Sequence, residues 1–262
     1  PPPPPCQYGF SHRVNVTGTE NVVRACVEAG VPWLIQTSTS NVSVGKDLGG
    51  RGMDERSPYV TAETTANHYS WTKVQAERAV LGANGTPLPG PRGGVLHTAS
   101  VRPCSGIFGP EDQFLCEFVM NMGRILVSVS ESVIDWTYVE NVVWAHFLLE
   151  KRLMEDPKLI GGQAFCISNE EPISADDFHT AIKYFYEQVM QKPIAIYYLY
   201  PRVLDFLAWC VETFTWLTGR PVPGDLGKLT PPMLLIMRKT FTFSTDKARR
   251  LLGYRPLYTF DE

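Results

Sequence analysis

A tyrosine and a lysine stand four residues apart in the stretch Tyr69-Ser70-Trp71-Thr72-Lys73. The periodicity of residues 68–81 predicts a helix, and this spacing would place both side chains on one helix face. A phenol has a pKa of about 10 in water, and a nearby ammonium favours its ionised form. The pair could therefore act as a general base on an alcohol. With 11 tyrosines in the chain such pairs also arise by chance, so the surroundings decide what this one means.

Hydroxyl side chains follow the apolar run 31–36, which is predicted to be a short buried strand: Thr37-Ser38-Thr39-Ser40. Ligands of open α/β sheets bind at the carboxyl ends of the strands, where these hydroxyls could hold an alcohol or carbonyl oxygen. They could equally be turn or cap residues. Counting forward along the strand selects Thr39 as the reactive hydroxyl, whereas counting back from Gly45 selects Ser40. We favour Thr39, because the buried pattern before it sets the strand register.

These residues need a scaffold of alternating helices and strands. A helix is predicted to end at Gly30 and to be followed at once by an apolar strand. A helix followed so closely by a strand is half of the strand-helix-strand unit from which parallel α/β sheets are built. Residues 104–132 read as irregular. The further elements predicted are a helix over 14–29, strands over 95–101, 133–139 and 164–168, and helices over 142–149 and around 178–185.

Composition excludes some classes of function. The 24 basic and 27 acidic residues give a net charge of −3, which offers no dense basic face for nucleic acid. The six cysteines form no C-x-x-C pair, which predicts reduced thiols and a cytoplasmic location. The five histidines have no metal-ligand spacing, so no metal is expected. The proline-rich start, residues 1–13, is predicted to be disordered.

The segment 193–237 is the most apolar part of the chain. Its central run, 203–217, contains Asp205 and Glu212 and is too short and too charged to span a bilayer. It could line an apolar pocket or lie on a membrane surface, and we favour the pocket. Trp209, Phe214 and Trp216 are candidates for the pocket wall or for contact with the membrane.

Four separated motifs stand in order along the chain. The first is the helix Val14-Asn15-Val16-Thr17-Gly18-Thr19-Glu20-Asn21-Val22 before the hydroxyl strand, and the second is the Tyr-x-x-x-Lys helix. The other two are Val101-Arg102-Pro103 with Gly106-Ile107-Phe108-Gly109-Pro110, and Tyr138-Val139-Glu140-Asn141-Val142-Val143-Trp144-Ala145-His146 with the C-terminal stretch 241–258.

Together these motifs resemble the 3β-hydroxysteroid dehydrogenase/isomerase family of extended short-chain dehydrogenases. Two further stretches look most like its family 42E members: Gln36-Thr37-Ser38-Thr39-Ser40-Asn41-Val42 and Ala83-Asn84-Gly85-Thr86-Pro87-Leu88.

The resemblance implies a role for each matching residue. Tyr69 would take the proton of a secondary alcohol as hydride leaves for NAD, with NADP not excluded. Lys73 would lower the pKa of Tyr69 and bind the nicotinamide ribose. The backbone of Pro103, Cys104 and Ser105 would face the nicotinamide carboxamide. Asn15 would lie on the family's active-site asparagine helix, or be an ordinary helix-start asparagine.

The implied fold is an α/β Rossmann-type parallel sheet with a small C-terminal substrate subdomain. No glycine-rich pyrophosphate turn precedes Val14, so the sheet is expected to be truncated at its N-terminal side. Residues 14–103 would form the partial NAD(P)-binding domain, and 104–262 the rest of the sheet interleaved with the substrate subdomain.

The implied function is oxidation of the CH–OH group of a steroid or similar apolar alcohol. The alternative is a non-catalytic protein that binds an apolar ligand or a partner protein. The resemblance also allows a homodimer, peripheral membrane contact through 193–217, and association with the endoplasmic reticulum membrane.

Overall fold

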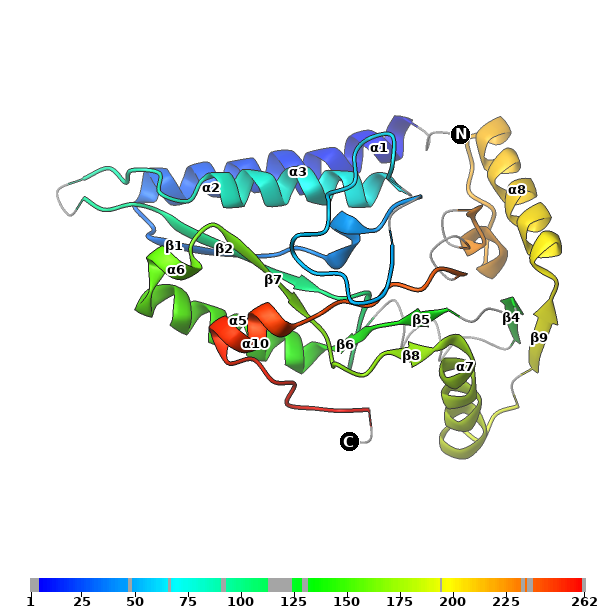
Figure 1. Ribbon diagram of the computed structural model, residues 1–262. Coiled ribbons are helices and arrows are strands. Elements are labelled where there is room, and N and C mark those ends of the chain that lie inside the picture. Colours follow the sequence, from blue (N-terminus) through cyan, green and yellow to red (C-terminus); the bar gives the residue numbers. More distant parts are fainter. Residues whose placement is uncertain are drawn as a thin grey trace.

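The computed structural model describes residues 5–46, 49–65, 67–90, 93–112, 124–128, 132–193, 195–231, 234 and 238–260. Its central feature is a parallel sheet in the order β1-β2-β7, formed by Trp33–Thr37, His97–Pro103 and Gln163–Ile167 (Figure 1). The register pairs Trp33 with His97 and Ala99 with Gln163. The predicted α/β class and parallel sheet are therefore confirmed.

Helices cover both faces of this sheet (Figure 1). Strand β2 is buried along almost its whole length, as expected for a strand that is covered on both faces of the sheet. One layer consists of α1 (Pro5–His12), the π-helical turn η1 (Arg13–Thr17), α2 (Gly18–Ala29) and α3 (His68–Gly82). The other consists of α5 (Val139–Glu155), α6 (Pro157–Ile160) and α10 (Asp246–Leu252).

The first helix starts earlier than the sequence predicts. We expected residues 1–13 to be disordered and the helix to begin at Val14, but the helical run begins at Pro5. A proline in the first turn is tolerated because its missing N–H has no intrahelical partner there. Residues 1–4 lie outside the described residues. The run ends as predicted at Gly30, whose φ of 67° is the left-handed conformation that glycine adopts without strain.

The main core lies between the sheet and the α5–α10 layer. Phe165 of β7 is fully buried there with Val101 of β2 and Leu149 of α5. Tyr254, just after α10, is also fully buried, and its hydroxyl donates to the carbonyl of Ser168 at 2.9 Å. This core ties the C-terminal part of the chain to the sheet.

Smaller elements extend from the carboxyl ends of the strands. The expectation of an irregular 104–132 is wrong in two places, because β3 (Gly106–Phe108) and β4 (Arg124–Ser128) lie within it. They pair in parallel with β6 (Trp136–Tyr138) and β9 (Ala195–Leu199). The remaining elements are η2 (Ser40–Ser43), β5 (Val133–Ile134), β8 (Ile173–Ser174), α7 (Ala175–Tyr184), η3 (Phe185–Val189), α8 (Pro201–Thr218) and η4 (Asp225–Lys228).

The predicted strand over 133–139 is interrupted at Asp135. This carboxylate is 1% exposed and accepts the backbone N–H of Phe243 at 2.6 Å. The interruption leaves two short strands, β5 and β6, and α5 follows directly at Val139, three residues before the predicted helix start.

Asp135 should make stability depend on pH. Burial raises its pKa to about 6, while the hydrogen bond from Phe243 opposes that rise. A carboxyl with a raised folded-state pKa contributes stability below the unfolded pKa of about 4 and loses it as the pH rises through 6. We therefore expect Asp135→Asn to raise the free energy of unfolding at pH 7.5 by about 3 kcal/mol, and not at pH 4.

Urea titration at the two pH values tests this, with Glu28→Gln as the control because its side chain is 70% exposed. An equal gain from Asp135→Asn at both pH values would show that the ionisation of Asp135 is not the cause.

The apolar helix α8 does not fit the pocket alternative that we favoured. Leu204, Ala208 and Val211 are buried, but the proposed pocket-wall side chains Trp209, Phe214 and Trp216 are 57%, 48% and 66% exposed. They point to solvent because the buried stripe of the helix is formed by a different set of positions. Among the described residues, no helix combines the length and the apolar content needed for a membrane span.

Candidate active site

The hydroxyl cluster and the 103–105 segment meet at the carboxyl ends of β1 and β2. The N–H of Ser38 donates to the carbonyl of Val101 at 2.7 Å. The N–H of Ser105 donates to the Ser40 hydroxyl at 3.1 Å, and Ser105 has a φ of 54°. The loops that follow the two strands are therefore joined by direct hydrogen bonds.

Helix α3 brings the lysine of the motif to the same place. Its N-terminus is capped by Asn67, whose side-chain oxygen accepts the N–H of Ser70 at 2.8 Å. The Lys73 ammonium donates to the carbonyl of Thr37, the last residue of β1, at 2.9 Å. Tyr69 lies one turn earlier on the same face of α3, and its side chain is 46% exposed.

The electrostatics of this pair differ from the expected pattern. The surrounding protein desolvates the Tyr69 phenol and raises its pKa, the opposite of what a base at neutral pH needs. Desolvation also lowers the pKa of Lys73, an effect opposed by the negative charge of Glu77. The predicted lowering of the Tyr69 pKa by Lys73 is thus not present in this structure.

The two candidate hydroxyls are engaged in different ways. Thr39 caps the short helix η2, and its oxygen accepts the N–H of Asn41 at 3.2 Å. Ser40 is 1% exposed and holds the backbone of Ser105. Each oxygen accepts one bond, so each hydroxyl hydrogen can still be donated to another acceptor.

Asn15 supports α3 from the neighbouring helix. Its side-chain amide donates to the hydroxyl of Thr72 at 3.0 Å, and that hydroxyl donates to the carbonyl of Tyr69 at 2.8 Å. Asn15 lies within the π-helical turn η1, a local widening that is frequent near functional sites. It thereby contacts the turn of α3 that carries the tyrosine.

Sequence reasoning missed His146 as a neighbour of this site. Its Nε2 lies 2.9 Å from the Thr37 hydroxyl, and its Nδ1 lies 2.8 Å from the carbonyl of Val142. Thr37 is therefore bound through its side chain to α5 and through its carbonyl to Lys73 of α3. His146 falls in the fourth matching motif, but that motif gave no sign of a bond to β1.

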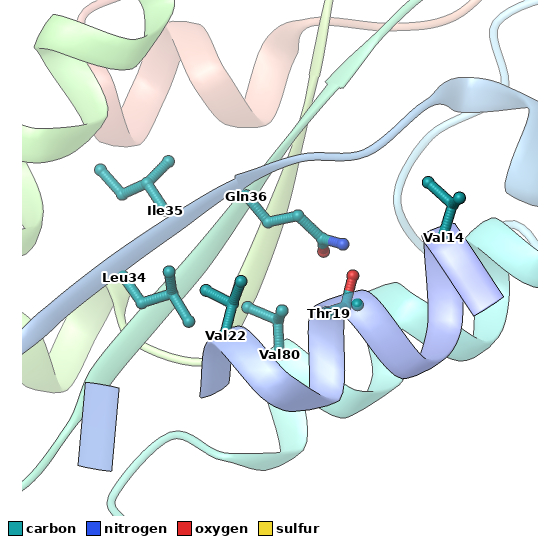
Figure 2. A pocket seen from close by; sticks show the side chains of 8 residues that line it. Val14, Thr19, Val22, Leu34, Ile35, Gln36 and Val80 are labelled. Carbon is teal, nitrogen blue, oxygen red and sulfur yellow. The ribbon is translucent and has the colours of Figure 1, made fainter. Parts of the chain in front are cut away.

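Two apolar grooves run along β1, one on each face of the sheet. The first has a volume of about 390 Å³. In Figure 2, Leu34 and Gln36 point toward the side of Val22 and Thr19, whereas Ile35 points away from them. The second groove, of about 570 Å³, is lined by Trp33, Ile35 and Thr37 of β1 and by the face of α5 that carries His146 and Phe147. Neither groove is lined by Tyr69 or Lys73.

The residues at the strand ends fit one end of a nicotinamide dinucleotide. Lys73 supplies an ammonium, Thr39 and Ser40 supply hydroxyls, and the loop at 103–105 supplies backbone groups beside them. The glycine-rich turn that would approach a pyrophosphate is not part of this sequence. Among the residues that the structure describes, no group of three or more His, Cys, Asp or Glu could hold a metal ion.

A family model described as "3-beta hydroxysteroid dehydrogenase/isomerase family" matches residues 7–194, more than half of the chain. The chain belongs to this family. Membership confirms the predicted resemblance and, by family, the prediction of a short-chain dehydrogenase. The match begins near the start of the described helix α1, so it contains the whole candidate site.

Relatives in the 3-beta hydroxysteroid dehydrogenase/isomerase family match over almost the whole chain. The "Sterol-4-alpha-carboxylate 3-dehydrogenase, decarboxylating" of Mus musculus is 34% identical, covering 100% of this chain and 69% of that protein. The "3 beta-hydroxysteroid dehydrogenase type 7" of Mus musculus is 36% identical, covering 96% of this chain and 68% of that protein. The "Short-chain dehydrogenase/reductase family 42E member 1" of Danio rerio is 35% identical, covering 97% and 68%.

Solved structures support the fold. "Crystal structure of gox2253" superposes with a TM-score of 0.66 at 23% identity, covering 95% of this chain and 69% of that chain. The NAD-bound DesIV double mutant, a dTDP-glucose 4,6-dehydratase from Streptomyces venezuelae, has a TM-score of 0.64 at 17% identity, covering 95% and 63%. At this level of identity the likeness shows the Rossmann-type architecture alone.

Proposed function

We propose that this chain contributes to an NAD-dependent oxidation of the CH–OH group of a steroid or similar apolar secondary alcohol. The observation that carries the proposal is the Lys73 ammonium bound to the last carbonyl of β1, on the helix face that also presents Tyr69. The names of the family relatives support hydroxysterol chemistry, and the NAD in the DesIV structure supports the cofactor.

Oxidation of the alcohol requires two transfers, a proton from its oxygen and a hydride from its carbon. NAD, when bound, supplies the acceptor for the hydride that leaves the alcohol carbon. Tyr69 takes the hydroxyl proton, for which its phenol must be ionised at the moment of transfer. Desolvation opposes that ionisation in the free chain. The Lys73 ammonium, one helical turn away on α3, would have to offset this desolvation when cofactor and alcohol are bound. Thr39 donates a hydrogen bond to the alcohol oxygen and holds it near Tyr69.

Binding of NADH tests the proposal first. Fluorescence and thermal-shift titrations should show binding to the 262-residue chain and weaker binding to a Tyr69→Phe/Lys73→Ala double variant. Oxidation of 3β-hydroxysterols is then assayed with NAD and with NADP. A folded chain that binds no NADH would contradict the proposal and favour a non-catalytic protein that binds an apolar ligand or a partner.

Thr39 and Ser40 should have separable effects on catalysis. Thr39 carries the hydroxyl assigned to the substrate, so Thr39→Val should lower kcat by roughly 10²-fold, as loss of a preorganised donor does elsewhere. Ser40 holds the Ser105 backbone, so Ser40→Ala should mainly raise the KM for NAD, by about tenfold. Thr39→Ser is the control that keeps the hydroxyl. A kcat loss confined to Ser40→Ala would reverse the assignment.

We also propose that α8 touches a membrane surface. Phe206 and Trp209 stack with ring centroids 6.1 Å apart, and both are exposed, as are Trp216 and Leu217. Exposed aromatic side chains on one helix suit the interfacial region of a bilayer. In a sedimentation assay the wild-type chain should be found in the pellet with phosphatidylcholine vesicles. The Phe206→Ser/Trp209→Ser variant should stay in the supernatant. Equal retention of both forms would contradict this role for α8.

A further inference from the structure

A glutamate lies one helical turn beyond the active-site lysine. Lys73 and Glu77 are four residues apart on α3, a spacing at which an ammonium and a carboxylate commonly pair on a helix. Here Lys73 donates instead to the carbonyl of Thr37. Something must therefore keep the Glu77 carboxylate from pairing with Lys73, one turn earlier on the helix.

Side chains from other parts of the chain, chiefly Arg102 and Tyr59, hold the Glu77 carboxylate. Arg102 of β2 donates through Nη2 to Oε1 at 2.6 Å and through Nε to Oε2 at 3.0 Å, a two-point contact. The Tyr59 hydroxyl donates to Oε1 at 2.6 Å. Glu77 is 0% exposed and Arg102 is 3% exposed, so water cannot replace these donors.

We propose that Arg102 and Tyr59 are positioning residues that hold the Glu77 carboxylate away from Lys73, which leaves the Lys73 ammonium at the end of β1. The importance of this arrangement for turnover rests on the function proposed above. The arrangement itself is a property of the folded chain and can be tested without cofactor or substrate.

The charges around this group are consistent with such a role. Burial raises the pKa of Glu77, but the hydrogen bond and charge of Arg102, together with hydrogen bonds from Ser38 and Tyr59, outweigh it, so the net pKa lies below its usual value. The Tyr59 ring lies between the guanidinium groups of Arg78 and Arg102, at 4.8 and 5.0 Å from its centroid. Arg102 is also within electrostatic range of the Cys166 thiol of β7 and of Lys247 of α10. Glu77 is the charged side chain that acts on Lys73 among the described residues.

Removing Arg102 alone can have two results, and these differ in the pKa of Lys73. If the proposal holds, the freed Glu77 carboxylate pairs with Lys73 and stabilises its ammonium form. If Glu77 instead takes up a proton in its buried position, its charge no longer acts on Lys73 and the pKa of Lys73 does not rise. The titration of Lys73 separates these outcomes, whereas a loss of stability would accompany either of them.

The experiment is a ¹⁵N-lysine NMR titration of the chain without cofactor, with the Lys73 signal assigned by its loss in Lys73→Arg. Arg102→Gln should raise the titration midpoint of Lys73 by about 1 pH unit, the usual effect of a close opposite charge. Arg102→Gln/Glu77→Gln should bring it back down to the wild-type value or below, because the carboxylate that favours the charged form of Lys73 is gone. A purely structural role for Arg102 predicts no such reversal.

A milder variant keeps the test decisive if Arg102→Gln does not fold. Arg102→Lys retains the charge but cannot make the two-point contact, so it should move the Lys73 midpoint upward by a smaller amount. An unchanged midpoint in a folded Arg102 variant, or an upward shift that persists in the double variant, would overturn the proposal. If the wild-type chain bound no NADH, the proposed function would be contradicted. The titration of Lys73, which is measured without cofactor, would still test the present proposal.

Discussion

Replacing Tyr69 with phenylalanine should lower kcat for alcohol oxidation by roughly 10²- to 10⁴-fold, the range expected for loss of a general base. The free energy of unfolding should change little, because the side chain is already 46% exposed and keeps its ring. The expected pattern is therefore a folded protein that still binds NADH but oxidises alcohol poorly. Steady-state kinetics with urea denaturation of the same samples measures both quantities.

The matched control is Tyr184→Phe on α7, which removes the same hydroxyl from a side chain that is 65% exposed. It should leave kcat unchanged. If Tyr69→Phe kept the wild-type kcat, Tyr69 could not be the base, and the proton acceptor would have to be sought among the hydroxyls at the ends of β1.

Replacing Asn141 with alanine should lower the free energy of unfolding by about 3 kcal/mol. Asn141 is fully buried on α5 and uses its whole hydrogen-bonding capacity. Its amide nitrogen donates to the side chain of Asn169 and to the carbonyl of Tyr258, both at 2.9 Å. Its oxygen accepts the N–H groups of Leu257 and Tyr258 at 2.7 and 3.1 Å. Alanine would leave these buried partners unsatisfied.

Urea denaturation measures this loss, and limited proteolysis should cut the variant within 255–260, because Asn141 anchors that segment. Asn21→Ala on the exposed side of α2 is the control, and its effect should stay within about 0.5 kcal/mol. A loss from Asn141→Ala no larger than that of the control would mean that the C-terminal segment is held by other contacts.

Local patterns made part of this molecule predictable. Residues close together in the sequence determine three of the predicted features, and they can be recognised without a structure. These features are strand β1, the end of the first helical run at Gly30, and helix α3. Tyr69 and Lys73 belong to the same class, since a spacing of four residues fixes their shared helix face. The rule that ligands of open α/β sheets bind at the carboxyl ends of the strands drew attention to the hydroxyl cluster, although its contact with 103–105 was not predicted.

Contacts between distant segments were not predictable in the same way. His146 and Thr37 are 109 residues apart, and no local pattern predicts their contact. Arg102 read as the end of a strand, although its side chain pairs with a glutamate 25 residues earlier. The faces of α8 were misjudged because hydrophobicity alone does not tell which side of a helix packs. Tertiary contacts decide that, and they placed Leu204 inside and Trp209 outside.

The order β1-β2-β7 has a consequence for amide hydrogen exchange. Within the described part of the sheet, β2 is bonded on both sides and β1 on one. The N–H groups of alternate residues in β1 point away from β2, so they should exchange with solvent deuterium sooner than those of Ala99 and Val101. Protection along β1 should consequently alternate from one residue to the next. Any strand that pairs with that edge would remove the alternation, which makes β1 a residue-by-residue reporter of what binds there.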